Sequence, residues 1–301
     1  MSALDTLPAT ARYSWGGDEF LFVEIAEAMS LAANVRVMAI ARGLTDQSLS
    51  GIVDICPANA SLLIRFDPDA LPPDILESTV RDLEAAAKEQ AATVLSTRIV
   101  EVPVWYDDPY TREVADRFRE GYHQDPTGSD VDYAARINGL ADAAEFIRRH
   151  HSQPWIVSMV GFVAGLPFLF QLVEQEHQLE VPKYLSPRTD TPRLTVGHGG
   201  CFACVYSVRG AGGYQMFGIA AAPIFDPAQS LPDFADSMVF FRPGDIVKFA
   251  PVTEAGYRRI QSEVDAGTFR YRTTPVEFET ERATADPEAY NITLLEVLGA
   301  Q

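Results

Sequence analysis

Three segments that lie close together in the chain decide its fold: VGFVAGLPFLF (160–170), SPRTDTPRLTV (186–196) and GAGGYQMFG (210–218). Glycines and prolines interrupt the apolar residues before a helical period can develop, a pattern typical of short buried β-strands joined by tight turns. Two Pro-Arg pairs in the middle segment place fixed cations beside this tight backbone. The stretch therefore predicts a β-barrel or sandwich with a pocket shaped for an anionic or polar group.

The chain before residue 99 has a mixed pattern of strands and helices. Apolar runs predict strands, and apolar residues three or four apart predict helices, with Ile75, Val80 and Leu83 facing inward in the second helix. The predicted strands span 19–25, 52–56 and 61–66, and the predicted helices span 25–42 and 72–92. We therefore expect residues 1–98 to form a small N-terminal α+β domain.

The rest of the chain is predicted to be a β-rich domain over 99–272 and a C-terminal extension over 273–301. After a strand at 99–106, the acidic segment 107–128 is expected to be a surface insertion with a short helix near 113–119. Further predicted elements are helices over 132–140 and 141–151, strands after Trp155, and a turn at 242–245 that leads into a strand over 246–249. The expected fold class is α+β.

The composition argues against several classes of function. With 24 basic and 42 acidic residues the formal charge is −18, and such a field repels phosphate backbones, so we expect no nucleic-acid partner. The first ten residues lack the basic and apolar regions of a secretory signal. Three cysteines cannot make a disulfide framework, which favours a reducing cytoplasm.

One uncharged segment, 154–173, is long enough to suggest a membrane span. Gly161, Gly165 and Pro167 interrupt it, and no second span candidate is present. We therefore expect a buried strand, a turn and a second short buried segment here, and no association with a membrane.

Seven motifs in a fixed order resemble one protein family. They are Gly17-Asp18, GIVDICPANASLLIRFDP (51–68), EVPVWY (101–106), DYAARINGLADAAEFIRRHHS (132–152), the Gly161-Phe162 core with its two Pro-Arg pairs, Gly212-Gly213-Tyr214, and PGDIVKF (243–249). The family comprises the B-type subunit of 5-oxoprolinase, allophanate hydrolase subunit 1 and the Kip-type kinase inhibitor. Its carboxyltransferase C/D module also occurs in urea carboxylases. The resemblance covers roughly residues 13 to 272.

The resemblance implies a small N-terminal α+β domain followed by a cyclophilin-like β-barrel. Members normally pair with a second, related carboxyltransferase-type subunit and share a site with it, where the complex acts on a small amide or carboxylate substrate at the expense of ATP. The chain is then expected to bind no cofactor itself, with ATP and any biotin on partner chains. The alternatives are a protein-binding inhibitor of a histidine kinase and a divergent carboxylase component for another small substrate.

The sequence also departs from the family pattern. Ala164-Gly165-Leu166 stands where the family usually has a Pro-Gly-Phe step. The segment VGHGGCFACVYSV (196–208) replaces the family's VPAGSV strand and the Gln-Thr-Gly turn that follows it. We therefore expect the specificity of this member to depend on the segment 196–208.

The pocket-forming stretch supplies the first candidate site residues. Arg188 and Arg193 each follow a proline, so each can present a planar guanidinium to a carboxylate or carbonyl oxygen, with structural ion pairs as the alternative. The backbone N–H groups of the loop 210–214 could face an oxyanion, although tight turning explains its glycines equally well. The candidate substrate-binding residues are Phe162, Tyr206, Gly212, Gly213 and Tyr214.

Histidines supply candidates for proton transfer. His151 closes a predicted helix, where capping is the plain alternative, and the matching family position makes it a candidate. His198 lies in the segment that replaces a pocket-lining strand of the family. The candidate catalytic residues are His151, Arg188, Arg193 and His198.

A zinc site and an independent nucleophile are both disfavoured. His198, Cys201 and Cys204 read HxxCxxC, but residues three apart on a strand point to opposite faces and no second CxxC follows, so buried thiols are favoured. No Gly-x-Ser-x-Gly elbow and no papain-like cysteine signature is present. We therefore expect the chain to act as a subunit of a hydrolase or carboxyltransferase complex and to be inactive alone.

Overall fold

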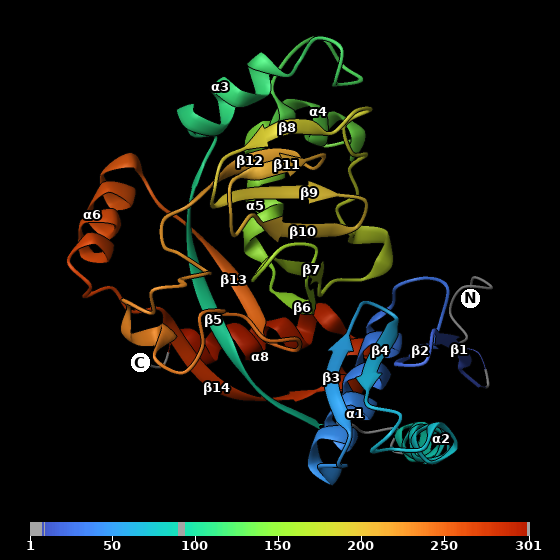
Figure 1. The fold of residues 1–301 in the computed structure, drawn as a ribbon. Helices are drawn as coiled ribbons and strands as arrows, with labels where there is room; N and C mark the ends of the chain where they lie inside the picture. The colour runs from blue at the N-terminus through green and yellow to red at the C-terminus, as the bar shows by residue number, and fades with distance from the viewer. Residues whose placement is uncertain (1–7, 9, 90–93, 300–301) are drawn as a thin grey trace. The chain divides into compact units, whose positions relative to one another are not determined.

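The computed structural model describes residue 8 and residues 10–89 and 94–299. The chain forms two compact units (Figure 1). The first comprises the described residues up to Ser96 together with Glu277–Asp286, and the second comprises Thr97–Val276 together with the described residues from Pro287 onward.

The first unit is an antiparallel four-stranded sheet packed against helices. The strand order is β1 (Arg12–Gly16), β2 (Phe20–Glu24), β4 (Ser61–Phe66) and β3 (Ile52–Pro57), and the helices are α1 (Leu31–Gln47), α2 (Pro73–Glu89) and α7 (Thr280–Ala285). Leu21, Val23, Leu62 and Ile64 alternate with outward-facing residues and are fully or almost fully buried against α1 and α2. The three strands predicted in this part of the chain are confirmed.

Two helix predictions need correction. The first helix begins at Leu31 and not at Ile25, because the Ser30 side chain accepts the Ala33 N–H and caps the helix, while Ile25 N–H donates to Ala60 O. In α2, Ile75 is 48% exposed and Leu76 is buried in its place, whereas Val80 is buried and Leu83 packs against the core, as predicted. The predicted end of this helix, 90–92, lies outside the described residues.

The second unit is built on a closed barrel of seven strands. Their order is β12 (Gln215–Ala220), β9 (Thr195–Gly199), β10 (Phe202–Val205), β7 (Pro167–Gln171), β6 (Trp155–Val160), β13 (Ile246–Pro251) and β5 (Val94–Tyr106), and β5 pairs back with β12. β14 (Arg272–Glu279) extends the sheet beside β5. Only the β13–β5 pair is parallel among the described barrel pairings. The predicted α+β class with a β-barrel is thus confirmed.

The barrel interior is apolar. Val100, Val102 and Val104 of β5 point into it, together with Trp155 of β6 and Phe249 of β13, all without exposed surface. The segment 154–173 forms the antiparallel pair β6–β7, as predicted. Among the described residues, no helix is both long and apolar enough to cross a membrane.

Helices and a small sheet surround the barrel. These elements are α3 (Pro109–Arg117), α4 (Asp130–Ile137), α5 (Ala143–Ser152), α6 (Glu254–Asp265), α8 (Pro287–Gly299), the short 3-10 helices η1 (Gln175–His177) and η2 (Pro232–Phe234), and the two-stranded sheet of β8 (Arg188–Thr191) and β11 (Gly210–Gly212). α3 and α4 pack on β12, and α5 packs on β13.

The segment 107–128 differs from the expected surface insertion. Its helix begins at Pro109, because the Asp108 carboxylate accepts the N–H groups of Tyr110 and Thr111 at 2.9 and 3.0 Å. Arg119 and His123 from the same segment are buried. The segment is therefore an integral part of the packed second unit.

Barrel closure depends on a close backbone approach at Gly218. This residue lies opposite Tyr106 in the β12–β5 pair, and a Cβ added to it would lie 2.6 Å from Trp105 O and 2.9 Å from Tyr106 Cα. The obstacle is backbone, which cannot move aside as a flexible side chain can. A side chain at position 218 must therefore push β12 away from β5.

We expect Gly218→Ala to lower the free energy of unfolding by about 2 kcal/mol, a typical cost of overpacking. Urea unfolding followed by circular dichroism measures this change. Gly210→Ala is the matched control, because a Cβ at Gly210 meets no atom within 4 Å. Equal stability of the two variants would contradict the proposed tight closure.

Candidate functional site

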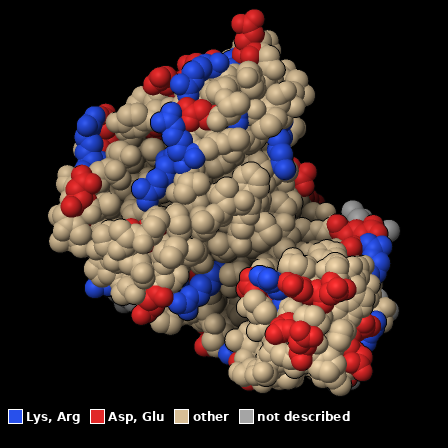
Figure 2. Space-filling view, viewed as in Figure 1, with Lys and Arg blue, Asp and Glu red and all other residues tan. Residues whose placement is uncertain are grey.

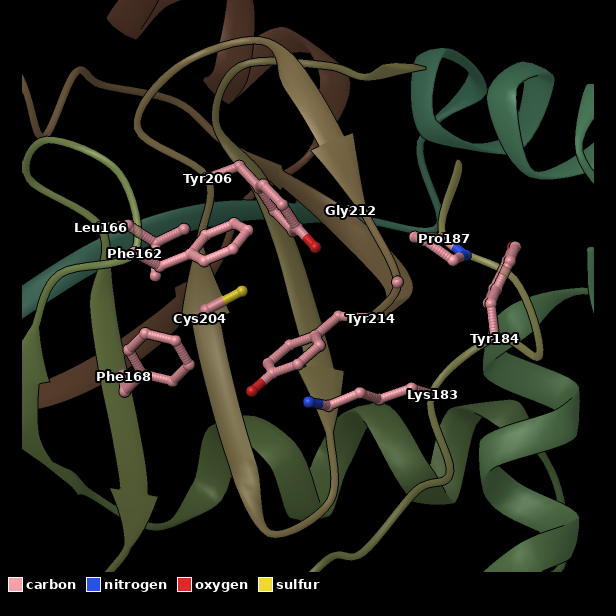
Figure 3. A pocket seen from close by; sticks show the side chains of 11 residues that line it. Phe162, Leu166, Phe168, Lys183, Tyr184, Pro187, Cys204, Tyr206, Gly212 and Tyr214 are labelled. Atoms are coloured by element: carbon pink, nitrogen blue, oxygen red, sulfur yellow. The ribbon is translucent and has the colours of Figure 1, made fainter. Parts of the chain in front are cut away.

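A cavity of about 300 Å³ lies on the outer side of the barrel wall. Side chains alternate along a strand, so Ala203 and Leu169 point into the barrel core, whereas Cys204 and Phe168 point into the cavity. The lining residues are Phe162, Leu166, Phe168, Lys183, Tyr184, Pro187, Cys204, Tyr206, Gly212, Gly213 and Tyr214. Figure 3 shows Phe162, Leu166 and Phe168 on one side of this view, Lys183, Tyr184 and Pro187 on the other, and Tyr206 and Tyr214 between them.

Two glycines let tyrosine side chains lie close against the backbone. A Cβ on Gly212 would overlap the Tyr206 hydroxyl group, and a Cβ on Gly199 would overlap the Tyr214 ring. Both tyrosines are buried and line the cavity. The absence of side chains at these two positions therefore gives the tyrosine rings their place in the pocket wall.

Arg188 lies behind this wall as a buried cation. It has no exposed surface, and its Cζ lies 4.3 Å from the centre of the Tyr184 ring. Its Nη2 donates to Thr191 Oγ1 at 3.3 Å, but its Nε and Nη1 have no hydrogen-bond partner. No carboxylate of the described residues forms an ion pair with it. A buried charge without a counter-ion is costly, so the geometry favours an anionic or polar ligand beside Arg188.

The wall that carries Arg188 is held by a second buried group, Asp130. Its carboxylate accepts hydrogen bonds from Arg119 Nη2 at 2.6 Å, from the Tyr184 hydroxyl at 2.7 and 2.8 Å, and from the Met216 N–H at 2.8 Å. Burial raises the pKa of Tyr184, which therefore stays a neutral donor to Asp130. Asp130 thus fixes the ring on which the Arg188 guanidinium stacks.

Tyr206 presents a hydroxyl group to the cavity. Burial raises its pKa, although the positive charge of Arg188 acts in the opposite direction. The phenol therefore stays protonated and has a hydrogen to donate. Tyr206 is therefore a neutral hydrogen-bond donor at the pocket wall.

The cavity has an unusual charge for this chain. Lys183 is the charged lining residue, with its Nζ 5.2 Å from the centre of the Tyr214 ring, and no lining residue is acidic. Arg188 adds a second cation behind the wall. Figure 2 shows acidic side chains crowded over the first unit, whereas much of the visible face of the second unit is uncharged. A carboxylate-free cavity with two cations in a chain of charge −18 is suited to an anion.

The structure brings most of the candidate pocket residues together. All five candidate substrate-binding residues, Phe162, Tyr206, Gly212, Gly213 and Tyr214, line the cavity, and Arg188 lies directly behind them. Sequence reasoning missed Asp130, Tyr184 and Lys183. Asp130 lies two residues before the predicted helix 132–140, where no motif marks it, and the segment with Lys183 and Tyr184 has no motif of its own.

The other candidate catalytic residues lie elsewhere. Arg193 is exposed and donates to Phe225 O at 2.9 Å. The His198 ring is buried on the opposite face of the barrel wall from Cys204, and its Nε2 donates to Leu179 O and Gly200 O at 2.9 and 3.1 Å. His151 is half-buried, and its carbonyl oxygen accepts from Lys248 Nζ. None of the three lines the cavity, and their part in proton transfer stays a prediction.

The cysteines do not combine with His198 into a ligand set. Cys56, Cys201 and Cys204 are free, and burial raises the pKa of Cys201 and Cys204, so both stay protonated. In the part of the chain that the structure describes, no group of three or more His, Cys, Asp or Glu side chains is placed to hold a metal ion. The cytoplasmic location inferred from the cysteines stays a prediction.

The buried arginines Arg188 and Arg119 allow a direct comparison. Arg188→Met removes an unpaired buried charge, so we expect the free energy of unfolding to rise by about 1 kcal/mol. Arg119→Met leaves Asp130 without its cation, and we expect a loss of about 3 kcal/mol. Urea unfolding of both variants measures these changes. A loss of stability in Arg188→Met as large as that in Arg119→Met would show that the cation is fully satisfied within the chain.

Two buried histidines give the structure a pH dependence. His150 Nδ1 lies 2.8 Å from the Tyr106 hydroxyl oxygen, and the rings of His150 and His198 lie 6.2 Å apart. Burial lowers the pKa of His150 well below its usual range and that of His198 to about 4. Each pKa is near 6.5 in an unfolded chain, so below that pH the unfolded state binds protons that the folded state does not.

We therefore expect the free energy of unfolding to fall as the pH drops from about 6.5 toward 4, with no contribution from these groups above this range. His198→Gln should reduce the slope by up to about 1.4 kcal/mol per pH unit. Urea midpoints at several pH values measure the slope, with His177→Gln, a change at an exposed histidine, as the control. An unchanged slope in His198→Gln would contradict the assignment.

Comparison with known proteins supplies independent information. The family profile of the carboxyltransferase domain, subdomain C and D, matches residues 11–235. The chain is 29% identical over 255 residues to the B-type subunit of 5-oxoprolinase from Bacillus subtilis, covering 82% of this chain and 95% of the relative. It is also 29% identical over 240 residues to the same subunit from Escherichia coli O157:H7, covering 79% of this chain and 94% of the relative.

Two solved yeast structures share the fold. Urea carboxylase of Kluyveromyces lactis superposes with a TM-score of 0.80 at 23% identity, covering 100% of this chain and 27% of that chain. Urea amidolyase of K. lactis gives a TM-score of 0.79 at 24% identity, covering 99% of this chain and 18% of that chain. The chain therefore corresponds to a minor part of each yeast protein, and at this identity the likeness shows the fold alone.

Proposed function

The chain belongs to the family of carboxyltransferase domains with subdomains C and D, and from this membership we propose that it is the B-type subunit of a heteromeric, ATP-dependent complex. The complex either hydrolyses an amide, as the name 5-oxoprolinase of two relatives indicates, or transfers a carboxyl group, as the yeast name urea carboxylase indicates. The membership confirms the resemblance drawn from the seven ordered motifs.

Within this complex the cavity binds a small amide or carboxylate substrate. The observation that carries the proposal is the buried Arg188, with two unpartnered nitrogens, behind a cavity without a carboxylate. The Tyr206 hydroxyl group donates to a ligand oxygen, and the positive charge of the buried Arg188 behind the wall favours a negatively charged ligand.

The remaining chemistry belongs to partner chains. Cys204, the thiol in the cavity, is kept protonated by burial and is a poor nucleophile. The cavity lining has no carboxylate that could coordinate the Mg²⁺ of bound ATP. We therefore assign ATP and any biotin to partners, one of which is a related carboxyltransferase-type subunit that completes the site.

Co-expression with the related subunit tests the proposal. We expect a stable hetero-oligomer by size-exclusion chromatography with light scattering, and ATP-dependent turnover that this chain alone lacks. Arg188→Met in the complex should lower kcat/KM by about 100-fold, a typical effect of removing an electrostatic contribution to a site. Arg258→Met, at an exposed ion pair on α6, is the control.

Two results would contradict the proposal. One is the absence of any complex with the related subunit, and the other is full activity of the Arg188→Met complex. Binding to a histidine kinase in place of the related subunit would instead support the inhibitor alternative.

A further inference from the structure

We infer that the cavity takes a carboxylate carried on a flat, apolar body that is larger than a urea or a single lactam ring. The inference rests on the proposed function for the reaction in which this ligand takes part. The ligand class itself follows from the walls, the charges and the size of the cavity.

The walls are apolar and aromatic. Phe168 and Tyr214 face each other edge to face, with ring centres 6.2 Å apart and planes at 82°. Phe162, Leu166 and the protonated Cys204 complete this side (Figure 3). A urea molecule presents polar atoms in every direction, and these walls would leave most of them without hydrogen bonds. A flat apolar body instead gains contact with every one of these side chains.

The mouth of the cavity continues this apolar wall. Phe162 is 73% exposed, and its backbone φ of +70° lies in the left-handed region, which is unfavourable for a bulky residue. Gly165, with φ of +73°, helps the same loop to turn. The loop therefore holds an aromatic ring at the cavity entrance, where it would cover the apolar body of a bound ligand.

The polar groups define where the carboxylate lies. Among the lining side chains, the Tyr206 hydroxyl and the Lys183 ammonium group can donate to a ligand, in addition to the hydroxyl of Tyr214; the Tyr184 hydroxyl already donates to Asp130. Arg188 adds positive charge behind Tyr184 and Tyr206. No acidic group of the lining competes for these donors. An anion is therefore favoured over a neutral amide of the same shape.

The size of the cavity agrees with this ligand. Its volume of about 300 Å³ lies at the lower end of the range of about 300–1,000 Å³ that is typical of clefts for drug-sized ligands. A urea molecule or a single lactam ring would leave much of this space, and much of the apolar wall, in contact with water. Apolar surface that stays in contact with water contributes nothing to the free energy of binding.

Isothermal titration calorimetry on the full chain tests the inference with four probes: 3-phenylpropanoate, its amide 3-phenylpropanamide, 5-oxoproline and urea. We expect 3-phenylpropanoate to bind at least about tenfold more tightly than 5-oxoproline, because its ring buries more apolar surface. The amide should bind about tenfold more weakly than the acid, because it lacks the charge. Urea should give no saturable binding.

Variants separate the two parts of the recognition. Phe168→Ala should remove the preference for 3-phenylpropanoate over 5-oxoproline, with Phe22→Ala, at a partly exposed aromatic of the first unit, as the control. Lys183→Met should weaken both acids and leave the amide unchanged, with Arg258→Met as the control. Lys183 is exposed, so its substitution is compatible with folding, and circular dichroism verifies this for each variant.

Tighter binding of urea or 5-oxoproline than of 3-phenylpropanoate would overturn the inference, as would equal binding of the acid and the amide. Both results are measured on this chain alone and concern the cavity walls that it contributes to the site. A failure to assemble with the related subunit would overturn the proposed function and leave the order of the four probes unaffected.

Discussion

The buried carboxylate of Asp130 is the group on which the candidate site depends. It joins Arg119 from the segment after α3, Tyr184 from the segment before β8, and the Met216 N–H of β12. These three segments are distant in sequence, and the common acceptor connects them. Through the Tyr184 ring, the same carboxylate sets the place of the Arg188 guanidinium. Asp130, which does not line the cavity, thus positions Arg188, the cation that favours an anionic ligand.

Arg119 and Arg188 illustrate two uses of buried charge in one site. Arg119 neutralises Asp130, and the pair contributes to the rigidity of the pocket wall. Arg188 has no such partner, so part of its electrostatic stabilisation is left for a ligand. Arg119 therefore serves stability, whereas Arg188 costs stability in the free chain and serves binding. Such a cost is common where a site is pre-organised for the charge of its ligand.

Much of this architecture could be predicted from the sequence, and the failures have physical causes. The glycine- and proline-interrupted runs correctly predicted the β6–β7 pair, because tight turns leave a local signature, and the candidate residues around Gly212 line the cavity. The position of His198 could not be predicted, since only the pairing register decides which face of a barrel wall a side chain takes. Asp130 and Tyr184 gave no signal, because their roles arise from contacts between distant segments.

The order of strands around the barrel also has a consequence for how the chain folds. β5 pairs with β12 and with β13, and the paired residues Tyr106 and Gly218, and Val102 and Phe249, are all separated by more than about 100 residues. The first unit likewise includes Glu277–Asp286 from near the end of the chain. Neither unit can be completed until its C-terminal segment, beyond residue 276, has left the ribosome. Nascent chains will therefore expose unpaired β5 for a long part of synthesis, when chaperone binding or early contact with a partner subunit would matter most.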